Sequence, residues 1–138
     1  MINKLVASVK ESTMVRWFVN RILFHKIPFN APHKPVLLLS ILQAVQNSVI
    51  EENRIYITPE IVALFTANWS SLVITNNHCQ FFLPFYRLQS EPFWKLIPKS
   101  GYENLLLVKS SITSLHGLNA AVEYAQIDEE LFLLMKIP

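Results

Sequence analysis

Residues 31–47 read Ala-Pro-His-Lys-Pro-Val-Leu-Leu-Leu-Ser-Ile-Leu-Gln-Ala-Val-Gln-Asn, and they hold one of the most informative patterns in the chain. It predicts a helix over roughly residues 35–47, in which Pro35 occupies the first turn, where a missing backbone N–H costs nothing. The apolar residues of this helix are Val36, Leu37, Leu38, Leu39, Ile41, Leu42 and Val45. They run almost all the way round it, and a helix that is apolar on every side is a buried one. We therefore expect this helix at the centre of the core.

The rest of the chain predicts further helices and a few short strands. Apolar spacing indicates one or two amphipathic helices in residues 2–26. Strand and cap signals then predict a turn at 51–54, a strand at 55–57, a helix from the N-cap Thr58 to about Ser71, a loop at 74–80, and a final helix at 128–136. Aromatic-rich runs in residues 81–97 suggest two short strands in a hairpin around residues 89–92. The apolar run at 105–108 fits either a strand or a helix end.

Length and composition bound the class of protein. The chain has 138 residues, of which 51% are apolar and 16% charged, enough for one core. We expect a single domain over residues 1–138, mainly α with a small antiparallel β-sheet (α+β): a compact helical domain with a late β-hairpin. No apolar run approaches the roughly 18–20 residues that span a bilayer, and no secretory signal is evident. Cys79 is the single cysteine, so no internal disulfide can form. We expect a cytoplasmic protein with no membrane partner.

Charge is distributed unevenly along the chain. Residues 1–35 hold six basic groups and one acidic group, which is +5, whereas the remaining residues hold six basic and nine acidic groups, which is −3. Such asymmetry indicates an anionic partner for the N-terminal third, nucleic acid being the commonest. A solvated amphipathic helix with a basic polar face would explain it equally well.

The sequence has none of the common catalytic or metal-binding patterns. No two of its four histidines stand three or four residues apart, and no second cysteine accompanies Cys79. Two glycines in the whole chain exclude glycine-rich phosphate loops. We expect no catalytic residue, no metal and no cofactor, and interpret the chain as a binding module.

The first candidate binding segment is residues 32–35, at the start of the predicted central helix. Free backbone N–H groups and the positive end of the helix dipole attract anions there, and His33 and Lys34 add donors. The alternative is a loop-to-helix cap in which the prolines only stiffen the backbone.

The second candidate segment is residues 84–88, which we predict to be a strand. Strand alternation would place Phe85 and Arg87 on one face and Tyr86 on the other. Arg87 is the cation best suited to grip a phosphate in bidentate fashion. The alternative is a core strand with one exposed arginine.

Taken in order, residues 31–35 with their leucine-rich helix, residues 53–55, residues 84–90 and residues 93–96 resemble the sulfur-binding domain of phosphorothioate-dependent restriction endonucleases. That domain commonly precedes an HNH nuclease domain in McrA-like, type IV enzymes of bacterial defence. No HNH motif occurs in this sequence.

The resemblance implies a DNA-binding module for double-stranded DNA in which sulfur replaces a non-bridging phosphate oxygen. The sulfur would sit in a shallow apolar cavity among basic residues, and the module would target a C-terminal HNH nuclease domain. Carried over by motif, Pro32 and Ala31 would form the wall of the cavity, and Phe85 and Tyr86 would shape it. His33 and Lys34 would contact the DNA backbone, and Arg87 would flank the modified group. The expected DNA-binding residues also include Lys26, Gln89 and Ser90. Two other hypotheses remain: a protein-interaction domain without DNA affinity, and a stand-alone nuclease, which the missing metal ligands disfavour.

Overall fold

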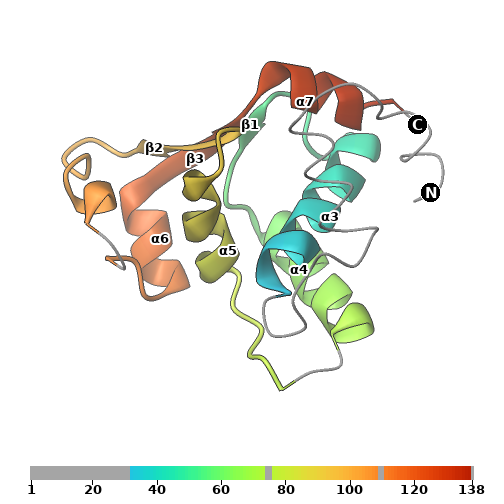
Figure 1. Ribbon diagram of the computed structural model, residues 1–138, viewed down its shortest axis with the longest axis horizontal. Coiled ribbons are helices and arrows are strands. Elements are labelled where there is room, and N and C mark those ends of the chain that lie inside the picture. The colour runs from blue at the N-terminus through green and yellow to red at the C-terminus, as the bar shows by residue number, and fades with distance from the viewer. Residues whose placement is uncertain (1–31, 74–75, 109–110, 138) are drawn as a thin grey trace.

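The computed structural model describes residues 32–73, 76–108 and 111–137, and Figure 1 gives the labels used below. In chain order the elements are α3 (His33–Gln46), β1 (Arg54–Ile55), α4 (Pro59–Leu72), α5 (Phe82–Arg87), the 3₁₀ turn η1 (Leu88–Ser90), β2 (Trp94–Pro98), the 3₁₀ turn η2 (Leu105–Leu107), α6 (Leu115–Ala121), β3 (Val122–Ile127) and α7 (Glu129–Met135). The predicted helices of residues 2–26, and the candidate residues Lys26 and Ala31, lie outside the described residues.

Helix α3 is the centre of the core, as the sequence predicts. Its residues from Pro35 to Leu42 are all buried, as are Ala44 and Val45. Helices α4, α5 and α7 each contact α3, and α5 lies between α6 and the α3–α4 pair (Figure 1). The buried Ser40 hydroxyl donates to the Val36 carbonyl and accepts from the Asn68 side chain of α4 at 2.9 Å. A helix apolar on all sides thus has its one buried hydroxyl fully paired.

The sheet has three antiparallel strands in the order β1-β3-β2. The central strand β3 pairs Gln126 with both Arg54 of β1 and Lys95 of β2, so these three exposed residues form one row across the solvent face. Helix α6 and turn η2 separate β2 from β3 along the chain. The mainly α, α+β class is confirmed. The strands β2 and β3 pair with each other, but they are not joined by a tight hairpin turn, because η2 and α6 lie between them in the chain.

The predicted hairpin at residues 81–97 is wrong. Residues 82–87 form α5, residues 88–90 form η1, and a strand begins only at Trp94. The side chains of Phe81, Phe85 and Leu88 are buried at spacings of four and three residues, which is a helical period. Pro84 is accepted because it lies in the first turn, where the N–H has no intrahelical partner. Residues 82–87 pack against α3, and this packing outweighs the preference of their aromatic side chains for a strand.

The predicted helix ends are confirmed at α4 and α7. Thr58 accepts a hydrogen bond from the Ile61 N–H at 3.3 Å, and Asp128 accepts one from the Leu131 N–H at 3.2 Å. The predicted strand at 55–57 is shorter and begins one residue earlier, at Arg54. The apolar run at 105–108, left open between strand and helix end, is the 3₁₀ turn η2. Among the described residues, no helix has both the length and the apolar character to span a bilayer.

Candidate functional site

An open hollow of about 650 Å³ brings together residues from three parts of the chain. It is lined by Lys34 of α3, Tyr86 and Arg87 of α5, Gln89 and Ser90 of η1, and Leu106 and Leu107 of η2. Five of these seven are residues that the sequence singled out. The two leucines are additions that sequence reasoning missed, although the apolar run at 105–108 was visible as a pattern.

Hydrogen bonds through Ser90 tie the start of α3 to the end of α5. The Lys34 Nζ donates to Ser90 Oγ at 3.3 Å, and this hydroxyl donates to the Arg87 carbonyl oxygen at 3.0 Å. Arg87 itself is the exposed last residue of α5. Two cations thus lie at the same hollow because one serine joins the segments that carry them.

The Tyr86 side chain contacts the segment that follows η2, beside the hollow. Its ring is buried, and its hydroxyl donates to the Val108 carbonyl at 2.8 Å and lies 3.4 Å from Ser111 Oγ. These contacts hold the chain on either side of residues 109–110. The apolar turn η2 is thereby positioned beside the cations.

His33 lies next to this hollow without lining it. Its Nε2 is 2.9 Å from the His78 carbonyl oxygen, and its ring centroid is 4.5 Å from that of Trp69. Burial of the ring lowers the pKa of His33, the hydrogen bond to His78 partly opposes this, and the positive charge of Arg87 lowers the pKa further. A neutral imidazole donating from Nε2 to the carbonyl fits this environment.

Stability should depend on pH through His33. Because its pKa is lowered in the folded state, the unfolded chain binds the proton more readily. The contribution of the neutral ring to the free energy of unfolding is complete above the ordinary pKa of 6.5, and we expect it to be lost as the pH falls through 6.5 toward the lowered pKa. Urea titrations at several pH values should show this decline, and His33→Gln should lessen it. Parallel curves for the two proteins would contradict the assignment.

The remaining predicted site residues are not in the hollow. Pro32 is half-buried as the N-cap residue of α3, and its carbonyl accepts from the Val36 N–H. Phe85 is fully buried, with its ring edge-on to Trp94 at 5.2 Å, so it supports the core and does not wall a ligand cavity. The predicted face shared by Phe85 and Arg87 is therefore wrong, because on a helix they point in different directions.

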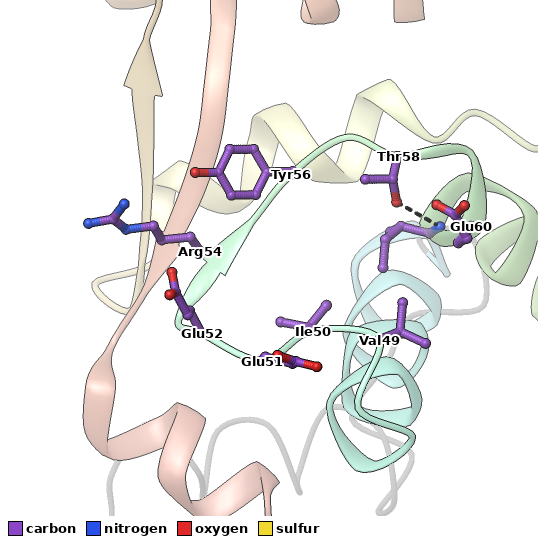
Figure 2. A pocket seen from close by; sticks show the side chains of 9 residues that line it. Val49, Ile50, Glu51, Glu52, Arg54, Tyr56, Thr58 and Glu60 are labelled. Atoms are coloured by element: carbon purple, nitrogen blue, oxygen red, sulfur yellow. Dashed lines mark hydrogen bonds between the residues drawn. The ribbon is translucent and has the colours of Figure 1, made fainter.

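A second hollow, shown in Figure 2, has the opposite electrostatic character. Its volume is about 320 Å³, and its charged lining groups are Glu51, Glu52, Glu60 and Arg54. Arg54 also lies over the Tyr124 ring, 5.3 Å from its centroid. Three carboxylates against one guanidinium repel an anion, so this hollow does not suit a phosphate.

Neither metal chemistry nor a thiol nucleophile is suggested by the described residues. No group of three or more His, Cys, Asp or Glu side chains that could hold a metal is found within residues 32–73, 76–108 and 111–137. Burial raises the pKa of the Cys79 thiol, which keeps it protonated and weakly nucleophilic near neutral pH.

The fold and site together define a mainly α, α+β domain that carries a cationic hollow with an apolar wall. No protein-family model and no curated protein matches this sequence.

Proposed function

We propose that this chain is a DNA-binding module that recognises phosphorothioate-modified double-stranded DNA, acting as the targeting domain of a modification-dependent restriction endonuclease. The observation that carries the proposal is the meeting of Lys34 and Arg87 with Leu106 and Leu107 around one open hollow. Positive charge would hold the phosphate group, and the apolar wall formed by Leu106 and the Tyr86 ring would receive its sulfur.

The chemistry of the modified group suits such a mixed wall. Sulfur is larger and more polarisable than oxygen and a poorer hydrogen-bond acceptor, so it gives up less hydration on leaving water. An ordinary phosphate oxygen would leave water bonds unmade, at about 1–3 kcal/mol. Burial of about 40 Å² of soft surface adds roughly 1 kcal/mol. The sum predicts a preference for sulfur of roughly 30- to 1000-fold.

The shape and charge of the hollow favour a long polyanion over a small enclosed ligand. It lies open at the surface, and the polar side chains of Gln89 and Ser90 lie beside the cations. Side chains of these types commonly contact phosphates and base edges in nucleic-acid complexes. His33, which precedes Lys34 in the chain, would contribute from the border of the same surface.

The direct test is a binding titration against one duplex with and without a single backbone sulfur, at about 150 mM salt, where non-specific affinity is suppressed. We expect binding to the sulfur-bearing duplex at least 30-fold tighter than to its matched oxygen control. Equal affinity for both duplexes would contradict sulfur recognition and indicate a general DNA-binding module.

A protein-interaction domain is the second candidate, and the exposure of Leu107 and Val108 favours it. Their side chains are 83% and 57% exposed. Absence of DNA binding even at low salt, together with concentration-dependent self-association, would support this candidate instead.

A further inference from the structure

The tip of η2 is an exposed apolar projection. Leu107 is the most exposed of the large apolar side chains described, at 83%, and Val108 follows it. Leucines this exposed gain nothing from folding, because their apolar surface stays in water. Leu107 also lines the cationic hollow, so the projection borders the proposed phosphate contacts.

Hydrogen bonds and the buried side chain of Leu106 hold the projection in place. Leu106 is buried between its two exposed neighbours, and the Leu107 N–H donates to the Asn104 carbonyl at 3.2 Å. The Val108 N–H donates to the Leu105 carbonyl at 3.1 Å, and the Val108 carbonyl accepts from Tyr86. The turn therefore presents Leu107 on a hydrogen-bonded base and loses little conformational entropy on contact with a partner.

We propose that Leu107 is a wedge that inserts at the base step beside the phosphate held by Lys34 and Arg87, unstacks that step and bends the duplex. The proposal rests on the proposed function and adds how the DNA is deformed. Apolar side chains such as leucine, pushed between base pairs from the minor groove, kink DNA in this way. Leu107 lines the same hollow as Lys34 and Arg87, so a phosphate held by these cations would bring the adjoining bases within its reach.

Charge selects nucleic acid as the occupant of this surface. Among the described residues that line its hollow, the apolar tip has two cations and no carboxylate beside it. The nearest acidic residue along the chain, Glu103, accepts from the Gly101 N–H at 3.4 Å, toward the other end of the loop. A polyanion that also offers flat apolar base faces matches both features of the surface.

The wedge also gives specificity at positions that the chain does not contact. Bending energy depends on the sequence that is bent, and pyrimidine–purine steps unstack most easily. We therefore expect phosphorothioate linkages at such steps to bind more tightly than the same linkage within a stiff A-tract.

The experiment uses the whole 138-residue chain and a duplex with one phosphorothioate, with 2-aminopurine placed in turn on each side of the modified linkage. Fluorescence of this base rises when it is unstacked. We expect a rise on saturation with wild-type protein at one flanking position, and end-to-end shortening of the same duplex by energy transfer. Leu107→Ser should bind about tenfold more weakly and, at saturation, should produce neither signal.

Leu133→Ser is the matched control, because Leu133 is a 53% exposed leucine on α7, outside the hollow. It should bind and unstack DNA like the wild type. Tight binding without any fluorescence rise, or the same rise with Leu107→Ser, would overturn the wedge and leave sulfur recognition intact. Failure of the wild-type chain to bind either duplex would overturn the proposed function and the wedge together.

Discussion

Arg87→Ala should lower the affinity for phosphorothioate DNA by roughly 30- to 1000-fold, because it removes a charge-assisted, bidentate grip on the phosphate. The free energy of unfolding should stay nearly unchanged, since the Arg87 side chain is exposed at the end of α5. The slope of log affinity against log salt should fall by about 0.9 for the one lost phosphate contact. Fluorescence-anisotropy titrations at three salt concentrations measure the affinity and its salt dependence, and a urea titration measures the free energy of unfolding.

Two further variants make this prediction specific. Lys95→Ala removes an exposed cation on β2, on the solvent face of the sheet, and should change the affinity less than twofold. Arg87→Lys keeps the charge but not the planar fork, and should recover only part of the affinity. Equal losses from Arg87→Ala and Lys95→Ala would mean that the hollow is not the binding site.

The same Arg87→Ala variant has a readout that needs no DNA. The charge of Arg87 helps to lower the pKa of His33. Its removal should let that pKa rise toward the ordinary value, which an NMR titration of the imidazole would detect. An unchanged His33 titration would contradict an electrostatic interaction between the two groups.

Phe85→Ala should destabilise the fold by about 3–5 kcal/mol, the typical cost of truncating a buried aromatic side chain. Phe85 is fully buried and contacts the rings of Phe81 and Trp94, at centroid distances of 5.4 and 5.2 Å. Trp94 also donates its indole N–H to the Phe85 carbonyl, which the substitution leaves in place. The expected loss approaches the whole stability of a typical small domain, so denaturant titrations should show a large drop in midpoint.

Phe85→Leu separates a core role from a ligand-contacting one. It keeps much of the buried volume and should cost about 1–2 kcal/mol, with DNA affinity unchanged at temperatures where the variant is folded. Phe82→Leu, at a half-buried position of the same helix that packs against the edge of the core, is the control for a conservative change and should cost less. Weaker binding by Phe85→Leu, with unaltered stability, would restore Phe85 to the wall of a ligand cavity.

Local patterns predicted the elements whose determinants lie within a few residues of each other. The all-round apolar pattern of residues 35–45 identifies a buried helix without reference to any partner, and α3 is one. Thr58 and Asp128 mark the starts of α4 and α7 because a side-chain cap acts on backbone groups only two or three residues away.

Residues 81–97 show where local reasoning fails. Aromatic side chains favour strands on average, but that preference is weak and depends on what the side chains pack against. Here α5 packs against α3, which comes from a distant part of the chain. Because a strand was predicted where α5 forms, Phe85 and Arg87 were also placed incorrectly on one face.

Residue type and short-range spacing were enough to predict the buried central helix and the α+β class, and to select the candidate residues Lys34, Tyr86, Arg87, Gln89 and Ser90. That these five residues share one hollow, with Leu106 and Leu107 beside them, is apparent only from the folded chain. The physical reason is that hydrogen bonds from Lys34 to Ser90 and from Tyr86 to Val108 join segments 22 to 56 residues apart, and no local pattern encodes such contacts.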